Sequence, residues 1–295
     1  MNIGYFLELL INGALTGLMY SLTALGIVLI YKSSGVPNLA QGAMVMISAY
    51  LVWMFANMLG LPIFIAIALA AVAMFAFGLL AERLLLRKMV GQPIIMIVML
   101  TLGLEIFLRG LGPGLLGAAP KSFDIGIDIM PIIYGDIFIH RTYLIGAIVA
   151  VVMIGLALLF FRTRLGTKLR AVSDDHVASW SVGISVERAI GISWGLAGMS
   201  AVAAGVMWGS EQGVDWTLSM LLFPAIAVVI LGGLDSIHGV LVAGLIVGIL
   251  GSVIPGYVDP IVGGGTRDVV TSLIILLTII FRPHGIFGRE DIERI

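Results

Sequence analysis

The chain has 295 residues, of which 60% are hydrophobic and 11% are charged, and its formal net charge is −1. Soluble domains carry about 25% charged residues, so this composition excludes an ordinary soluble protein and indicates a protein that crosses a membrane many times. The net charge gives no reason to expect a nucleic-acid partner, and the absence of cysteine excludes disulfides, thiolate catalysis and cysteine metal ligands.

Nine apolar segments approach the length needed to cross a bilayer, whose core of about 30 Å requires about 20 helical residues. They lie near residues 5–31, 37–58, 62–81, 92–112, 142–161, 188–209, 218–234, 237–256 and 267–281. No positively charged region precedes the first segment, so we interpret it as a retained span rather than a cleaved signal peptide. The seventh is short and interrupted by Pro224 and Gly232, which predicts a broken or partly re-entrant helix. The sequence therefore predicts an all-α polytopic membrane protein with eight to nine transmembrane helices, in one domain over residues 1–295.

The basic residues predict the orientation. With nine spans, 12 of the 16 Lys and Arg residues fall on the side of Arg162, and the other four are Arg109, Lys121, Arg141 and Arg267. Because Lys and Arg accumulate in cytoplasmic loops, the N-terminus is expected outside and the C-terminus inside. Nine spans also allow an inverted arrangement of four, one and four.

The longest external loop is expected over residues 113–141. Apolar and polar residues alternate there in short runs split by Met130–Pro131, which predicts two small strands. Asp124, Asp128 and Asp136 are expected to face water. The loop either covers the outer mouth or receives an external partner.

The main cytoplasmic loop is expected over residues 162–188. Its first half is basic, and its second half predicts a short helix with Ser173 as N-cap and Gly183 as the stop. Asp174 and Asp175 would lie in the first turn, where the helix dipole favours anions. Val177, Trp180 and Ile184 would form one apolar face. This helix either lies on lipid headgroups or docks on a cytoplasmic partner.

Few residues suggest chemistry within the chain. The sequence contains no GxxxxGK[ST], HExxH or GxSxG motif, and its four histidines lack metal-ligand spacing. We therefore expect no catalytic site, no metal site and no cofactor of the chain's own.

Two polar pairs lie within apolar spans. Glu105 and Arg109 are four residues apart in the fourth span, and they form either a static ion pair or a polar element of a substrate path. Asn38 and Gln41 follow Pro37, so they belong either to an irregular backbone beside a passage or, for Asn38, to a helix cap. Pairs of glycines four residues apart, which allow close helix packing, are Gly13/Gly17, Gly191/Gly195, Gly205/Gly209 and Gly244/Gly248.

Five ordered segments resemble the permease subunits of branched-chain amino acid ATP-binding cassette (ABC) importers almost end to end. They are NGALTGLMYSLTALGIVLIY, SGVPNLAQGAMVMISAY, RTRLGTKLRAVSDDHVASWSVGISVER, AVVILGGLDSIHGVLVAGLIVGIL and RPHGIFGREDIERI. Two departures concern the substrate: the family's His-Gly-Glu is replaced by Gln41-Gly42-Ala43, and the Pro that follows Gly-Ser-Ile is replaced by His238.

The resemblance implies a location in the bacterial inner membrane and a set of partners. These are a second related permease, two cytoplasmic subunits that bind ATP and Mg, a periplasmic substrate-binding protein and membrane lipid. It also implies that the short cytoplasmic helix is the coupling helix, with Ser173, Asp174, Asp175, His176, Val177, Trp180 and Gly183. The substrate path is expected at Asn38, Gln41, Glu105 and Arg109.

The expected substrate is a branched-chain or other amino acid, with urea or an amide as the alternative. A rival reading is an ion-coupled secondary transporter that uses Glu105 as its proton carrier, and a third is a structural or lipid-interacting bundle.

Overall fold

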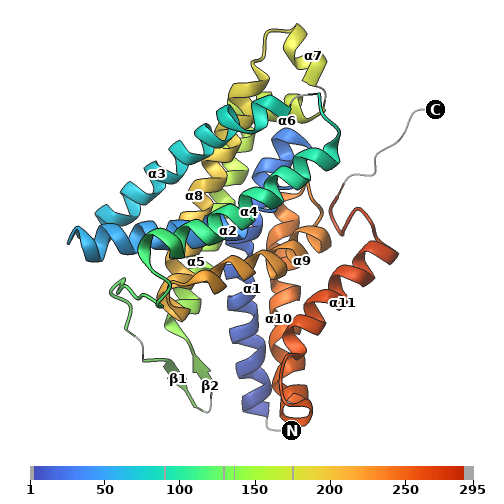
Figure 1. Cartoon of the computed structure of the whole chain (residues 1–295). Helices are drawn as coiled ribbons and strands as arrows, with labels where there is room; N and C mark the ends of the chain where they lie inside the picture. The colour runs from blue at the N-terminus through green and yellow to red at the C-terminus, as the bar shows by residue number, and fades with distance from the viewer. Residues whose placement is uncertain (1–2, 90, 129, 136, 175, 289–295) are drawn as a thin grey trace.

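The computed structural model describes residues 3–89, 91–128, 130–135, 137–174 and 176–288, without the side chains of residues 176 and 177. The described chain is almost entirely helical (Figure 1). The first half contains α1 (Ile3–Ser34), α2 (Gln41–Trp53) with its π-helical end η1 (Met54–Met58), α3 (Ile63–Leu84), η2 (Leu86–Met89), α4 (Ile94–Leu116), β1 (Ile132–Tyr134) and β2 (Ile137–Ile139). The second contains α5 (Arg141–Arg162), α6 (Arg164–Asp174), α7 (His176–Ser181), α8 (Val186–Gln212), η3 (Trp216–Leu221), α9 (Leu222–Gly232), α10 (Ile237–Val262) and α11 (Thr266–Phe281).

Every one of the nine apolar segments forms a helix. Among the described residues, seven helices are long and apolar enough to cross a membrane: α1, α2 with η1, α3 with η2, α4, α5, α8 and α10. The seventh predicted segment is short, as expected, but it forms a continuous helical stretch, Trp216–Gly232, that changes from the 3-10 helix η3 to the 11-residue α9 at Leu222 and is not broken at Pro224. The ninth is α11, which has 16 residues. A total of eight to nine crossings depends on these two short helices and stays a prediction.

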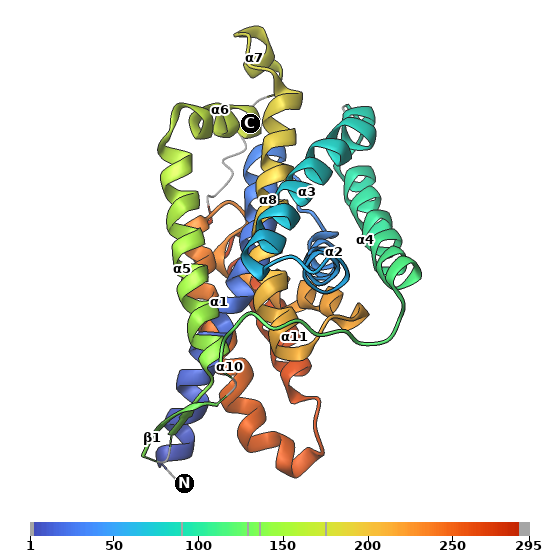
Figure 2. The same ribbon diagram turned by 90° about the vertical axis from the view of Figure 1, so that its left-hand side faces the viewer.

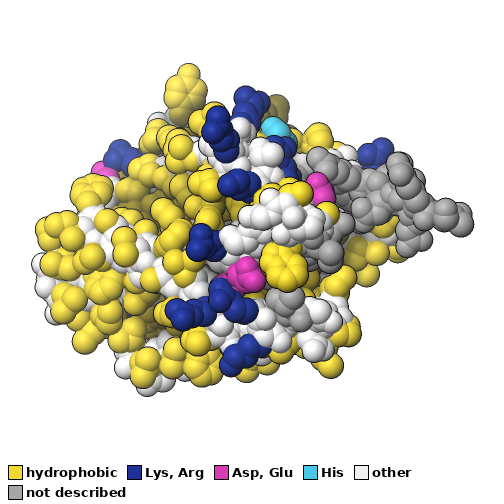
Figure 3. Space-filling model, turned by 90° about the horizontal axis from the view of Figure 1, so that it is seen from above, with side chains coloured by type: hydrophobic (Ala, Val, Ile, Leu, Met, Phe, Trp, Pro, Cys, Tyr) yellow, Lys and Arg dark blue, Asp and Glu magenta, His cyan; other side chains and the backbone are white. Residues whose placement is uncertain are grey.

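The molecule has two chemically different ends. One end carries α6, α7 and the C-terminal end of α1, where the Lys32 ammonium donates to the Asp235 carbonyl at 2.7 Å. Seen from above, this end presents many Lys and Arg side chains and few acidic ones (Figure 3). The opposite end carries the N-terminal part of α1, the β-hairpin and the turn between α10 and α11 (Figures 1 and 2). The first end is therefore the side of Arg162, whose cytoplasmic location stays a prediction from the positive-inside rule.

Helix α1 packs on α10 through glycines on both helices. Gly13 and Gly17 face Gly248 and Gly244 so closely that a methyl group on Gly17 would overlap the Gly244 carbonyl. Ser21 adds a hydrogen bond from its hydroxyl to the Val240 carbonyl at 3.0 Å. The predicted close packing of these glycines is confirmed.

Helix α8 packs on α3 in a similar way. A methyl group on Gly195 would lie 2.6 Å from the Phe75 ring, and one on Gly198 would overlap the Met74 carbonyl. Gly78 of α3 faces the backbone at Trp194. Helix α8 thus lies at the centre of the molecule, with one face on α1 and another on α3.

The structure places the two predicted strands of the external loop at other positions than expected, and it shows the contacts of two of the loop's aspartates. Two short strands do form, but both follow Pro131 instead of flanking it, because Gly135 with φ of 63° supplies the hairpin turn. Asp128 forms an ion pair with Arg141 at 2.9 Å, and Asp124 accepts a hydrogen bond from the Gly126 amide. Asp136 lies outside the described residues.

Candidate functional site: the α7 end and the polar residues of α2 and α4

The segment before α7 folds differently from the prediction. Helix α6 begins at Arg164, where the Thr163 hydroxyl accepts a hydrogen bond from the Gly166 amide at 3.3 Å, as an N-cap does. Leu169 and Val172 are buried beneath α6, and this amphipathic pattern extends the helix to Asp174. Ser173 was predicted to be an N-cap, but that prediction is wrong. Ser173 lies in the last turn of α6.

Because α6 extends to residue 174, Asp174 does not lie in the first turn of the next helix, where it was predicted. Asp174 ends α6 instead of beginning α7, and Asp175 lies outside the described residues. His176 and Val177 begin α7, but their side chains lie outside the description. The predicted stop at Gly183 is confirmed, since Gly183 has φ of 81° and its amide donates to the Trp180 carbonyl at 3.0 Å.

Helix α7 presents apolar side chains away from the bundle. Figure 2 shows α7 standing beyond the ends of the long helices. Trp180 of α7 is 72% exposed and Val182, in the turn that follows α7, is 74% exposed, whereas Ser179 of α7 is buried. Exposed apolar side chains beside a cation-rich face are typical of a surface that another molecule covers.

A cavity of about 730 Å³ lies beside α7. Its walls come from the ends of α1, α3, α4 and α8, and Trp180 forms part of its rim. Glu82, Arg87 and Glu187 supply its charged groups.

Asn38 and Gln41 lie in an irregular connection that returns into the bundle. Residues 35–40 are not helical, and Gln41 lies beside Gly26, eight residues before the end of α1. The Asn38 side-chain oxygen accepts from the Ala40 amide at 3.0 Å, and the Gln41 amide nitrogen donates to the Ala197 carbonyl at 3.2 Å. Asn38 is thus not the N-cap of α2, and the backbone there is irregular as predicted, while a passage beside it stays a prediction. Both side chains are fully buried.

Glu105 and Arg109 form an ion pair near the middle of α4. The Arg109 Nε lies 3.5 Å from the Glu105 Oε1, and their side chains are 36% and 9% exposed, respectively. A partly exposed guanidinium in an apolar span requires water or protein beside it.

The structure brings these two polar pairs onto adjoining elements. The Leu39 amide donates to the Thr101 hydroxyl at 3.2 Å, and Thr101 lies one turn before Glu105 on α4. The same region contains the start of η3–α9, because Gly42 of α2 packs against the Ser219 carbonyl and Leu222. Helix α7 is separate from this group and lies at the end of the molecule (Figure 2).

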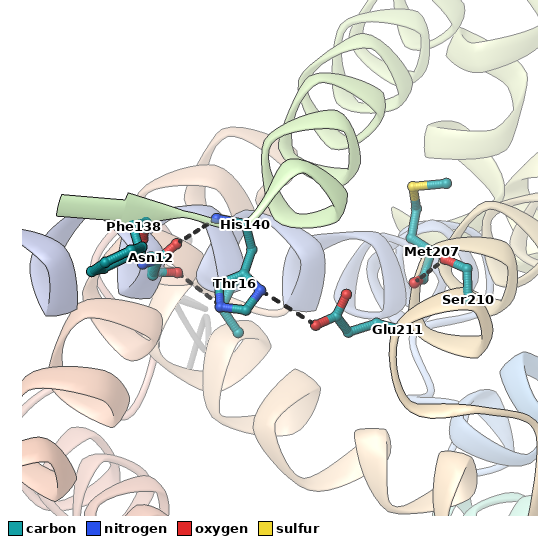
Figure 4. Close-up of polar contacts among 7 residues, drawn as sticks. All are labelled: Asn12, Thr16, Phe138, His140, Met207, Ser210 and Glu211. Atoms are coloured by element: carbon teal, nitrogen blue, oxygen red, sulfur yellow. Dashed lines mark hydrogen bonds and ion pairs between the residues drawn. The ribbon is translucent and has the colours of Figure 1, made fainter. Parts of the chain in front are cut away.

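Sequence reasoning missed a polar cluster at the opposite end (Figure 4). The Asn12 side chain donates to the Phe138 carbonyl at 2.7 Å and accepts from the His140 amide at 3.3 Å. His140 also lies 3.9 Å from the Glu211 carboxylate and stacks on Tyr143. The signal for this cluster was a lone Asn12 in an apolar helix, which indicates a buried or paired amide but names no partner.

Comparison with known proteins identifies the family. Residues 9–281 match the model of the branched-chain amino acid transport system / permease component family. The high-affinity branched-chain amino acid transport system permease protein BraD of Pseudomonas aeruginosa is 29% identical over 318 residues, which cover 100% of this chain and 99% of BraD. The corresponding LivH protein of Escherichia coli (strain K12) is 27% identical over 308 residues, which cover 99% of this chain and 98% of LivH.

Among solved structures, PsaBC from Streptococcus pneumoniae in complex with Fab has a TM-score of 0.49 at 16% identity, with 96% of this chain and 94% of that chain covered. The assignment itself rests on the sequence matches. With its many apolar helices and its match over most of its length, the chain belongs to the family of branched-chain amino acid transport permease components.

Proposed function

We propose that this chain is the transmembrane permease subunit of an ABC importer that moves a branched-chain or other amino acid inward across the bacterial cytoplasmic membrane. The family assignment and the full-length similarity to BraD support this proposal. The single observation that carries the ATP-driven mechanism is the exposed apolar surface of α7 at the cation-rich end. On this proposal the α7 end faces the cytoplasm, the N-terminus lies outside and the C-terminus lies inside.

The proposed partners divide the work. Two cytoplasmic subunits bind ATP and Mg, a second related permease completes the passage, and a periplasmic binding protein delivers the substrate. The chain itself contains no nucleotide-binding loop of the GxxxxGK[ST] type, so it acts as a transporter subunit and not as an enzyme.

The architecture around α7 suits the transmission of force. Helix α6 is fixed to α5, because the Arg170 guanidinium donates to the Phe161 carbonyl at 3.1 Å and Gly166 packs on the Phe161 backbone. Only the short turn at residues 182–185 separates α7 from α8. Because α8 packs on α1, α2 and α3, a displacement of α7 by an ATPase subunit would reach the centre of the molecule.

We assign Arg109 to the substrate path. Its partly exposed guanidinium can pair with the carboxylate of an amino acid, and Glu105 holds it in place from the buried side. Asn38 and Gln41 support this region by fixing the turn between α1 and α2. An importer of urea or an amide is the second candidate, since Gln41 and Ala43 stand where the family commonly has His and Glu.

We also propose the inverted arrangement of four, one and four helices. In such a repeat α1 corresponds to α8, α2 to η3–α9 and α3 to α10. The α1–α10 contact then corresponds to the α8–α3 contact, and these two are the most extensive contacts between helices. The irregular spans α2 and η3–α9 meet at Gly42, and interrupted helices at equivalent positions of two repeats often mark a transport site.

The test is Trp180→Asp, with Trp180→Phe as the matched control. A charge on this apolar surface should disrupt the docking of an ATPase subunit, whereas phenylalanine keeps the surface apolar. We expect Trp180→Asp to abolish ATP-driven uptake and substrate-stimulated ATP hydrolysis in proteoliposomes that contain all the subunits, while the variant still inserts into the membrane. Unchanged subunit co-purification and uptake in Trp180→Asp would contradict the coupling role.

The ion-coupled rival makes the opposite prediction. It requires uptake by this chain alone under a pH gradient, with loss of uptake in Glu105→Gln. The contact of Glu105 with Arg109 argues against a free proton carrier. A complete dependence of uptake on ATP and on the partner subunits would exclude this rival.

A further inference from the structure

The cavity beside α7 has the size and composition of a small-molecule site. Its volume of about 730 Å³ lies within the range of ~300–1,000 Å³ that is common for such sites. Most of its wall is apolar and includes Leu86, Ile94, Ile97, Ile190 and Trp194. The cavity also borders the coupling segment through Ser173 and Trp180 and the polar region of α2 and α4 through Thr101, whereas these five residues belong to neither.

The charged groups of the cavity are arranged around one guanidinium. Arg87 donates from Nε and Nη2 to the two oxygens of Glu82, at 3.2 and 3.1 Å. The Glu82 side chain is only 6% exposed and that of Arg87 is 49% exposed. Since a guanidinium has five N–H donors, the other donors of Arg87 remain available to a ligand.

Glu187 provides a second carboxylate in the same cavity. It lies in the first turn of α8, and within the described part of the chain it has no hydrogen bond or ion pair. The cavity therefore offers a guanidinium for an anionic group, a carboxylate for a cationic group and an apolar wall. These three features match an α-amino acid with an apolar side chain.

We propose that this cavity binds an apolar α-amino acid from the cytoplasmic side and that the bound amino acid restrains α7. The ammonium group would pair with Glu187, the carboxylate would accept from Arg87, and the side chain would lie against Ile97 and Trp194. Because Trp180 of α7 and the α3–α4 turn both line the cavity, a ligand between them would hold α7 in place. This inference rests on the proposed function of α7, and it makes the transported amino acid an inhibitor of its own import.

An anionic phospholipid fits the cavity less well. Its acyl chain would suit the apolar wall, but its phosphate would lie near the carboxylates of Glu82 and Glu187. The carboxylate of an amino acid meets the same repulsion between like charges, but the amino acid also carries an ammonium group beside its carboxylate, which offsets that repulsion. The charge pattern thus favours a zwitterion.

The first experiment measures binding without transport. Radiolabelled leucine is equilibrated with the purified permease and its partner subunits in detergent, in the absence of the binding protein. Glu187→Gln and Ile97→Trp should each weaken binding by about tenfold or more, since one removes a charged partner and the other fills the cavity. Arg188→Gln and Ile95→Trp are matched controls on exposed neighbouring positions that do not line the cavity, and they should bind as the parent does.

Analogues of leucine sharpen this result. Leucinamide lacks the carboxylate and 4-methylpentanoate lacks the ammonium group, so neither should compete with leucine. Leucine binding that is absent in the parent, or that is equal in the parent and both cavity variants, overturns the proposal.

The second experiment measures feedback in proteoliposomes that contain all the subunits. Internal leucine should slow ATP-driven uptake in the parent and the controls. In the two cavity variants, the same fractional inhibition should require about tenfold more internal leucine. The rate of each protein is compared with its own rate without internal leucine. Uptake without internal leucine reports on the proposed function alone. Normal uptake with equal inhibition of all variants would overturn the cavity proposal and leave the importer function standing.

Discussion

The two largest helix crossings differ in what lies at the contact. Between α1 and α10, glycines face glycines, so backbone meets backbone at Gly17 and Gly244. Between α3 and α8, part of the contact is made by side chains, with the Phe75 ring against Gly195. A backbone contact cannot yield without a shift of the whole helix, whereas a side chain can change its rotamer. We infer that α1–α10 is the rigid crossing and that α3–α8, where backbone also meets backbone at Gly78 and Gly198, is adjustable only around Gly195. The adjustable crossing is also the one nearer to α7 and its cavity.

The largest expected effect is at the rigid crossing. Gly17→Val adds three carbon atoms, of which the Cβ overlaps the Gly244 carbonyl, so α1 and α10 must separate. We expect a loss of more than about 4 kcal/mol of stability, seen as little or no monodisperse protein in size-exclusion chromatography. Gly155→Val on α5, where a methyl group meets open space, is the control and should purify normally. A well-folded Gly17→Val protein would show that this crossing is not rigid.

A smaller effect is expected at the adjustable crossing. Gly195→Ala pushes a methyl group against the Phe75 ring at 2.6 Å, and rotation of the ring should limit the cost to about 1–3 kcal/mol. The midpoint of thermal unfolding in detergent measures this loss. Adding Phe75→Leu should recover much of it, because a smaller side chain makes room for the methyl group. If the double variant is as unstable as the sum of the two single variants, the ring is not what limits this contact.

The smallest effect concerns a hydrogen bond within the rigid crossing. Ser21→Ala removes the bond from the Ser21 hydroxyl to the Val240 carbonyl, and such bonds between membrane helices contribute about 0.6 kcal/mol on average. Thr23→Val is the control, because the buried Thr23 hydroxyl has no hydrogen-bond partner among the described residues and valine keeps the volume of the side chain, so the change should cost little. A thermal midpoint for Ser21→Ala far below that of Thr23→Val would mean that polar contacts, and not backbone fit, hold α1 to α10.

Helix positions and close glycine contacts were predictable, because apolar length and glycine spacing act locally. The nine segments, the short length of the seventh and the stop at Gly183 all follow from such local signals. The start of α6 was not foreseen, since the basic residues of 164–170 hid its buried Leu169 and Val172. The cap at Thr163 was overlooked for the same reason.

The polar site could be predicted in part. The spacing of Glu105 and Arg109 indicated their pairing, and Pro37 indicated the irregular start of α2. The cavity of Glu82, Arg87 and Glu187 could not be predicted, because it joins residues about 100 positions apart in the sequence. Only the packing of α3 on α8 brings these groups together.

The pairing of α1 with α10 has a consequence for biogenesis. The ribosome releases α1 first, whereas Gly244 and Gly248 follow more than 200 residues later. At translation rates of about 5–20 residues per second, the glycine stripe of α1 waits many seconds for its permanent neighbour. During that interval lipid, an insertase or another helix must cover this stripe. Helix α1 can therefore reach its final packing only after α10 has been synthesised.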